Sequence, residues 1–210
     1  MVEISFLDTA AFTAESYREI LNMLSKARRE KAERYRTQEA AYLSAGAGYL
    51  LDCTLRERGL TEKDAAYSYG KHGKPYIDGL HFNLSHSGTV AVLAVAQSEV
   101  GVDIEKIAPV TLKLIRRVCK ERECAYLFAL SEEERERAFF RYWTAKESAG
   151  KYLGTGLASP KEFEADLLCG EVKRKGETFP VREYALNGYA LTACAKEPFA
   201  PELKEVLIAS

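Results

Sequence analysis

The sequence predicts a protein of mixed helices and strands that is built from two similar halves. Apolar side chains recur with the helical period in some segments and alternate in others along the 210 residues. Two apolar strands that follow turns, residues 89–96 and 188–195, each come after long predicted helices. This repetition divides the chain into halves of roughly 100 residues, a common size for a small domain. The predicted division is residues 1–99 and 100–210.

The individual elements follow from the spacing of their apolar side chains. A helix is predicted over residues 14–36, with Thr13 as its cap. The continuous apolar run at 89–96 is typical of a strand buried on both faces, and the strict alternation at 100–105 predicts a second strand. The other predicted elements are a strand at 1–8, helices at 38–58, 111–119 and 132–153, a segment at 121–129 that continues the preceding helix or begins another, and strands and turns over 160–196.

The composition is that of an ordinary globular protein, with 47% apolar and 29% charged residues. The net charge of −1 lacks the basic excess of a nucleic-acid-binding protein. No stretch approaches the about 20 apolar residues of a membrane span, and the first residues lack the pattern of a secretory signal. The five cysteines include no C-x-x-C pair, which suits free thiols in a reducing compartment. A cytoplasmic location is therefore expected.

The strongest local feature is the segment Gly101-Val-Asp-Ile-Glu105. Alternate side chains of a strand share a face, so Asp103 and Glu105 point away from the core-facing valine and isoleucine. The strand rise puts their roots about 6–7 Å apart, and a hard cation such as Mg²⁺ prefers this kind of oxygen site. The alternative is a solvent-facing strand edge, because carboxylates are normally exposed.

A second candidate lies in the predicted helix, in Trp143-Thr-Ala-Lys-Glu-Ser-Ala-Gly-Lys151. Glu147 and Lys151 are four residues apart and share a helix face, next to the aromatic stripe of Phe140 and Trp143. A carboxylate in apolar surroundings is unfavourable unless it is paired or metal-bound. Glu147 is therefore a candidate third oxygen ligand, a general base, or both. The alternative is a surface salt bridge worth a few tenths of a kcal/mol.

A third candidate is Phe82-Asn-Leu-Ser-His-Ser-Gly88, which is interpreted as a small-residue turn before a buried strand. Its serines, His86 and nearby backbone amides could contact a phosphate. The alternative is a polar turn with an incidental histidine, since serine and glycine are common in turns. A Ser-His-Asp hydrolase is poorly supported, because no G-x-S-x-G elbow is present.

Basic residues form the fourth candidate group. Arg28 and Lys31 share a helix face, and Lys74 lies in Gly73-Lys-Pro75, where the proline stiffens the loop. The alternative is that these residues only belong to solvated, charged surfaces.

In their order and spacing, these motifs resemble the Sfp-type phosphopantetheinyl transferases. The resemblance runs from about residue 20 to residue 195. It rests on Gly73-Lys-Pro75, Phe82-Asn-Leu-Ser-His-Ser87, Gly101-Val-Asp-Ile-Glu105, and Trp143-Thr-Ala-Lys-Glu-Ser148 with Lys151 and Gly154-Thr-Gly-Leu157. It implies an α+β fold of two pseudo-symmetric halves, with coenzyme A in the cleft between them.

The resemblance also implies roles for the matching residues. Asp103, Glu105 and Glu147 would hold Mg²⁺ on the pyrophosphate of coenzyme A. Glu147 would be the general base for the serine of an apo acyl or peptidyl carrier protein, and Lys151 would neutralise phosphate charge. The implied contacts to coenzyme A are Arg28, Lys31 and Ser44 near the 3′-phosphate, Lys74 at the nucleotide, and Ser85 and His86 at the 3′-phosphate or pyrophosphate. Arg28 stands where the family often has lysine, which keeps the charge but changes the geometry.

The implied reaction moves phosphopantetheine to the carrier serine and releases adenosine 3′,5′-bisphosphate. The carrier is expected to dock against residues 107–128, where basic side chains could attract an acidic helix or could simply be solvated. These basic residues are Arg116, Arg117, Lys120 and Arg122. The expected partners are coenzyme A and the carrier, with no nucleic acid and no membrane, and the protein is expected to be a monomer. Two other functions stay open: another Mg²⁺-dependent phosphoryl or nucleotidyl transferase, and a non-catalytic module that binds coenzyme A or carriers.

Overall fold

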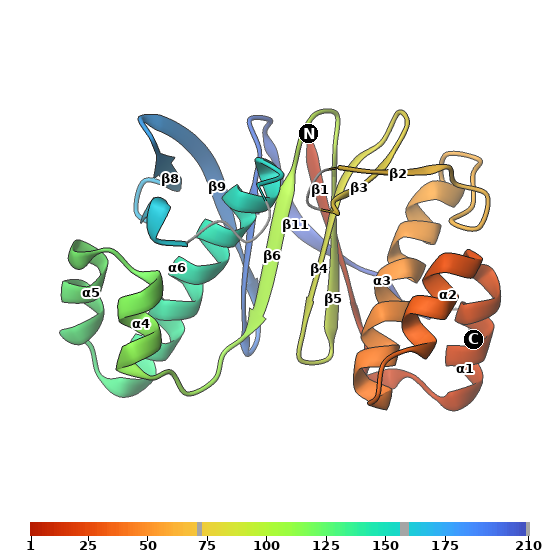
Figure 1. Ribbon diagram of the computed structural model, residues 1–210, viewed down its shortest axis with the longest axis horizontal. Coiled ribbons are helices and arrows are strands. Elements are labelled where there is room, and N and C mark those ends of the chain that lie inside the picture. Colours follow the sequence, from red (N-terminus) through yellow and green to blue (C-terminus); the bar gives the residue numbers. More distant parts are fainter. Residues whose placement is uncertain (71–72, 156–159, 209–210) are drawn as a thin grey trace.

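The computed structural model describes residues 1–70, 73–155 and 160–208, and it consists of two sheets packed face to face with helices on both outer sides (Figure 1). The first sheet has the strand order β11-β1-β5-β4 and the second has the order β6-β10-β9-β8-β7. The strands of the first sheet are β1 (Val2–Asp8), β4 (His81–Ser87), β5 (Val90–Ala96) and β11 (Phe199–Glu205). Those of the second are β6 (Gly101–Lys106), β7 (Glu164–Asp166), β8 (Glu171–Arg174), β9 (Glu177–Leu186) and β10 (Tyr189–Cys194).

In the first half, α3 (Gln38–Arg56) lies against the outer face of the first sheet, and α1 (Ala14–Met23) and α2 (Lys26–Glu33) pack on α3 (Figure 1). Leu50 and Leu51 of α3 are fully buried in one cluster with Ala91 and Leu93 of β5. A small ribbon of β2 (Tyr67–Tyr69) and β3 (Pro75–Ile77) completes this half. The even side chains of β5 face the second sheet, so β5 is buried on both faces as predicted.

The prediction of one helix over residues 14–36 is wrong, because the chain breaks between α1 and α2. Leu24 is extended, and the Ser25 hydroxyl accepts a hydrogen bond from the Arg28 amide as the cap of α2. Both the backbone and the side chain of Ser25 donate to the buried carboxylate of Glu62. This long-range partner favours the break, and the local helical period gives no indication of it.

The second half places α6 (Glu132–Tyr152) across β6 and β10, with α4 (Leu112–Val118) and α5 (Glu121–Phe128) outside it (Figure 1). A Cβ atom at Gly101 would collide with the backbone of α6 at Ser148 and Tyr152, so the helix touches the strand directly. Cys119 is extended between α4 and α5, so residues 121–128 begin a separate helix.

The interpretation of residues 82–88 as a turn is wrong, because residues 81–87 form β4. Phe82 and Leu84 pack toward the first core, while the polar residues between them face β6. The turn itself lies at Gly88, which has a positive φ of 60°. A strand with only two apolar side chains on its buried face resembles a turn when only composition is considered.

The core between the sheets joins the two halves. Val2, Val92 and Val102 are fully buried there, with Leu191 nearly so. Each half is thus a sheet with one long helix on its outer face, which is the α+β arrangement of two similar halves that the sequence predicts. β11 was not predicted, and it runs parallel to β1 in the first sheet, which brings the end of the described chain back to its beginning. The exact division at residues 99 and 100 stays a prediction.

None of the helices in the described part of the chain is long and apolar enough to cross a membrane.

Candidate active site

The candidate site lies where the edge strands β4 and β6 of the two sheets meet. Side chains of β4, and not its backbone, make the hydrogen bonds to β6. Asn83, Ser85 and Ser87 accept hydrogen bonds from alternate backbone amides of β6 at 2.9, 3.5 and 3.0 Å. The two-residue period of β4 therefore matches that of β6. As a result, the two edges are held a side chain apart, and the serine hydroxyls lie next to the acidic residues of β6.

Asp103 is the most buried member of the acidic group, with 5% of its surface exposed. Its Oδ1 accepts hydrogen bonds from Lys151 Nζ at 2.6 Å and from Ser85 Oγ at 2.9 Å. Its Oδ2 is the one buried side-chain polar atom of the described residues without a hydrogen-bond partner. Since buried polar atoms are almost always satisfied in folded proteins, this oxygen is available to a ligand.

Glu105 and Glu147 lie close enough to Asp103 for its negative charge to affect their pKa values. Burial raises the pKa of Glu105, and repulsion by Asp103 adds to the rise, while Ser87 Oγ donates to its Oε2 at 2.7 Å. Burial also raises the pKa of Glu147 to about 7, with Asp103 and Glu105 adding repulsion and Lys151 opposing it. Burial is the largest cause of both rises, and repulsion between the carboxylates adds to it while Lys151 opposes it.

The donor set fits a divalent cation, although the carboxylates are not converged on one point. Within residues 1–70, 73–155 and 160–208, no three acidic, histidine or cysteine side chains form a ready-made metal cluster. The ammonium group of Lys151 supplies the positive charge at Asp103 in this arrangement. The unpaired Oδ2 of Asp103 and the raised pKa values of Glu105 and Glu147 are what an oxygen site for Mg²⁺ would show before the cation binds.

Removal of the Glu147 charge is expected to stabilise the metal-free protein at alkaline pH. The pKa of Glu147 is about 7 in the folded protein against an ordinary value of 4.5. The folded state therefore binds more protons, and its stability falls as pH rises through that window. After a discount for solvent access, the effect is about 1–2 kcal/mol. Urea unfolding without divalent cations should show Glu147→Gln to be more stable than wild type at pH 8 and equal at pH 4; equal stability at both would contradict the assignment.

The predicted basic residues lie on the first half, facing the same region. Burial lowers the pKa of the His86 imidazole, and the ammonium groups of Lys151 and Lys31 lower it further. Desolvation and the neighbouring Arg28 likewise lower the pKa of Lys31. These effects place His86 within electrostatic reach of both Lys31 and Lys151, as an anion-binding group requires. Ser44 is buried in α3.

Arg28 is held in place by a buried carboxylate that the sequence did not indicate. Its Nε lies 2.9 Å from Glu62 Oε1 and 3.3 Å from the Tyr67 hydroxyl. Tyr67 itself donates to Glu62 at 2.6 Å. Glu62 is fully buried, so it fixes both the cap of α2 and the orientation of the arginine.

Lys74 joins the two halves. Its Nζ donates to Glu99 Oε2 at 2.6 Å, to the Lys151 carbonyl at 3.2 Å and to the Val100 carbonyl at 3.4 Å. The loop that carries Lys74 is therefore attached to the end of α6. Of the motif that follows α6, Gly156 and Leu157 lie outside the described residues.

This fold and site define an enzyme that combines an acidic group with facing basic residues, as phosphoryl transfer requires. A family model described as the 4′-phosphopantetheinyl transferase superfamily matches residues 99–194. The chain is 30% identical over 90% of its length to the 4′-phosphopantetheinyl transferase Sfp of Bacillus subtilis, of which 89% is covered. It is 32% identical to a further 4′-phosphopantetheinyl transferase of Bacillus subtilis, with 83% of each chain covered.

The protein belongs to the 4′-phosphopantetheinyl transferase family and is an enzyme of that class. Among solved structures, the holo-acyl-carrier-protein synthase of Thermotoga maritima aligns with a TM-score of 0.35 at 20% identity, over 46% of this chain and 61% of that one.

Proposed function

We propose that the protein transfers 4′-phosphopantetheine from coenzyme A to a serine of an apo acyl or peptidyl carrier protein, with Mg²⁺, and releases adenosine 3′,5′-bisphosphate. The observation that carries this proposal is the unpaired buried oxygen Asp103 Oδ2, on a carboxylate that lies within electrostatic reach of Glu105 and Glu147. Family membership supports the reaction class, and the charge distribution supports the metal and the phosphate-bearing substrate.

Asp103, Glu105 and Glu147 are the side chains that would hold Mg²⁺. When bound, the ion would neutralise the charge on the pyrophosphate oxygens during transfer. Ser85 and Ser87 orient Asp103 and Glu105 by donating to one oxygen of each carboxylate, which leaves the second oxygens free.

Glu147 is the proposed general base. A pKa of about 7 lies close to neutral pH, where a carboxylate can both be deprotonated and accept a proton effectively. It would take the proton of the carrier serine directly or through water while the serine oxygen bonds to the phosphorus that carries the pantetheine. The bond from that phosphorus to the bridging oxygen breaks, and the electron pair leaves with adenosine 3′,5′-bisphosphate. Lys151 would neutralise phosphate charge during this step.

The basic residues of the first half are the proposed contacts to the rest of coenzyme A. His86 lies within electrostatic reach of both Lys31 and Lys151, and Arg28, which neighbours Lys31, is held in place by Glu62. A phosphate placed there would relieve the repulsion that, in addition to burial, lowers the pKa values of Lys31 and His86. The remaining proposed contacts are Ser44, Ser85 and Lys74, of which Lys74 would act through the loop that it attaches to α6.

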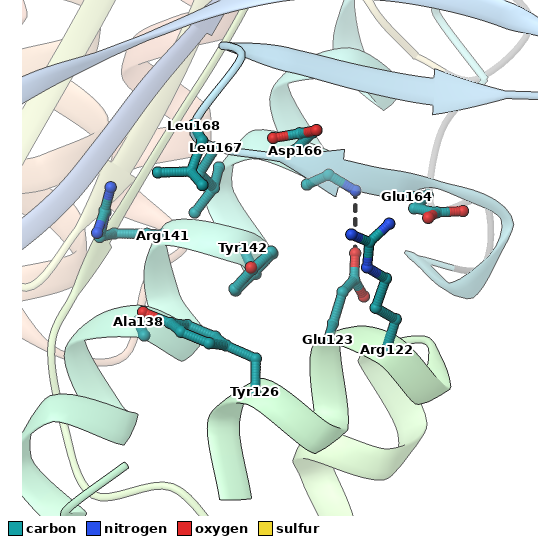
Figure 2. A pocket seen from close by; sticks show the side chains of 11 residues that line it. Arg122, Glu123, Tyr126, Ala138, Arg141, Tyr142, Glu164, Asp166, Leu167 and Leu168 are labelled. Atoms are coloured by element: carbon teal, nitrogen blue, oxygen red, sulfur yellow. Dashed lines mark hydrogen bonds between the residues drawn. The ribbon is translucent and has the colours of Figure 1, made fainter. Parts of the chain in front are cut away.

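The carrier is proposed to dock on α4 and α5. A cavity of about 380 Å³ opens between α5, α6 and β7, and Figure 2 shows Tyr126, Tyr142 and Leu168 around it with Arg122 at one side. Leu168 is fully exposed and Tyr126 is half-exposed. Its lining does not include the acidic group, but Tyr142 is only five residues, about 7.5 Å of helix rise, from Glu147. Together with these apolar side chains, the exposed Arg116 and Arg117 of α4 suit an acidic, amphipathic helix.

Neutralising Arg116 and Arg117 together is expected to raise KM for the carrier about tenfold at low salt, because rim charges act mainly on encounter. KM for coenzyme A and kcat should stay unchanged, and the effect should shrink as salt increases. Steady-state kinetics at two ionic strengths measures this. The matched control is R58A/K204A, which removes two exposed cations, one just after α3 and one on β11. Equal behaviour of the two variants would reject this docking surface.

The test of the function is incubation with coenzyme A, Mg²⁺ and a panel of apo carriers from fatty-acid, polyketide and peptide synthesis. One carrier should gain the mass of one phosphopantetheine, only with metal, and adenosine 3′,5′-bisphosphate should accumulate in equal amount. No gain on any carrier would instead favour a different transferase or a binding module. Size-exclusion chromatography tests the expected monomer, and fractionation of cells tests the expected cytoplasmic location.

A further inference from the structure

A buried ion pair lies beside the proposed catalytic residues. Lys146 precedes Glu147 in α6, and its side chain is fully buried, as is nearly all of Glu123 in α5. Lys146 Nζ donates to Glu123 Oε2 at 2.5 Å and to the Val118 carbonyl at 3.1 Å. Successive helix residues point about 100° apart, so Lys146 reaches the outer helices while Glu147 faces the acidic group.

The Glu123 carboxylate contacts several elements at once. Its Oε2 also accepts from the Lys120 amide at 2.7 Å, and its Oε1 accepts from the Ala165 amide at 2.9 Å. Figure 2 shows Glu123 reaching from α5 toward the strand that carries Glu164 and Asp166, where the dashed line marks the bond to the backbone amide. One carboxylate thus joins the start of α5, α6 and β7, and Lys146 adds the end of α4 through the Val118 carbonyl.

Stability alone is a weak reason for such a pair. Removing two charges from water is unfavourable, and well-packed apolar side chains of similar volume are often equally stabilising. A charged, hydrogen-bonded pair also fixes the relative orientation of the elements that it connects, because its contacts can form in one geometry only. The opposite side of α6 is already held to the second sheet by the close approach at Gly101 and by the hydrogen bond between Thr144 and Thr192 at 2.8 Å.

We propose that Lys146 and Glu123 are positioning residues that set the rotation of α6 about its axis, so that Glu147 and Lys151 face Asp103. The pair also makes that rotation depend on where α4 and α5 lie. This inference rests on the proposed function, because it concerns the roles assigned there to Glu147 and Lys151.

A small rotation of α6 would displace Glu147 and Lys151 enough to affect the reaction rate. A rotation of about 10° moves a group at the helix surface, about 5 Å from the axis, by about 1 Å. A misplacement of that size lowers the rate of a positioned reaction about 10²-fold. Substrate binding depends on many contacts from the first half, so it should change little.

The test compares the single variant Lys146→Met with the double variant K146M/E123L. The single variant leaves Glu123 buried without a partner and should lose much of its thermal stability. The double variant should recover Tm to within about 5 °C of wild type. Its kcat should nevertheless stay about 10²-fold low, while the Kd for coenzyme A, measured by calorimetry, changes less than about threefold. Recovery of kcat together with Tm would overturn the inference.

Two further variants complete the test. Glu123→Asp keeps the charge but shortens the side chain, so it should lower kcat clearly while Tm changes little. A wild-type kcat in this variant would also overturn the inference. This second variant tests the inference even if the double variant does not fold. The control is Arg137→Ala, which breaks an exposed pair with Glu133 on the same helix and should change neither quantity. A wild-type protein that modifies no carrier would reject the proposed function and the inference together, whereas an active wild type with an active double variant rejects only the inference.

Discussion

Replacing Glu147 with glutamine is expected to lower kcat for carrier modification about 10²–10⁴-fold, the range found for loss of a general base. Glutamine keeps the shape of the side chain but cannot accept the serine proton, and it is a weaker ligand for a cation. Coenzyme A should still bind, because its proposed phosphate contacts come from the first half and from Lys151. Rapid-mix transfer kinetics and calorimetry with coenzyme A measure the two properties separately.

The pH profile gives this prediction a second readout. Because a general base must be deprotonated, kcat of the wild type should rise with pH through the pKa of Glu147, about 7 in the ligand-free protein. A bound divalent cation would move that rise to lower pH, since an opposite charge favours the carboxylate form. The matched control is Glu133→Gln, an exposed residue at the start of the same helix. Normal turnover by Glu147→Gln would remove Glu147 from the role of base.

Replacing Asp103 with asparagine is expected to raise the Mg²⁺ concentration for half-maximal transfer by about 10²-fold or more. Changes in groups that only orient metal ligands already cost 10–100-fold in affinity, and Asp103 is proposed as a ligand itself. The substitution also removes the charge that holds Lys151 at 2.6 Å, so kcat should fall as well. Titration of the transfer rate with Mg²⁺ and direct binding of Mn²⁺ to the enzyme test both statements.

The control for Asp103 is Asp64→Asn, an exposed carboxylate of the first half. Unchanged Mn²⁺ binding in Asp103→Asn would exclude Asp103 from the metal site, even if activity fell through the loss of the contact to Lys151.

Much of the fold could be predicted because the signals were local. The helices at residues 38–56 and 132–152 and the strands at 90–96 and 101–106 carry clear apolar periods, and each lies where predicted. The break between α1 and α2 could not be predicted, because it depends on Glu62, 37 residues away from Ser25. β4 was missed for a related reason. Its polar side chains make hydrogen bonds to β6, but by composition alone a segment so rich in polar residues is typical of a turn.

The candidate site shows the same division. The alternation in Gly101-Val-Asp-Ile-Glu105 correctly separates the core-facing residues from Asp103 and Glu105. The role of Ser87 toward Glu105, the support of Arg28 by Glu62, and the pair of Lys146 with Glu123 were not predicted. One signal in the sequence could have indicated that the two segments are neighbouring strands. Ser85 and Ser87 are two residues apart, and so are Asp103 and Glu105, with which they pair.

The sequence by itself determined the chemistry of the side chains, the order of the motifs and the face on which the residues of β5, β6 and α6 lie, because these depend on neighbours within a few residues. Only the tertiary structure decided which groups meet: Lys151 reaches Asp103 across 48 residues, and one oxygen of Asp103 is left without a partner. Burial and distance set these contacts and the raised pKa of Glu147, and both arise from packing between segments that are remote along the chain.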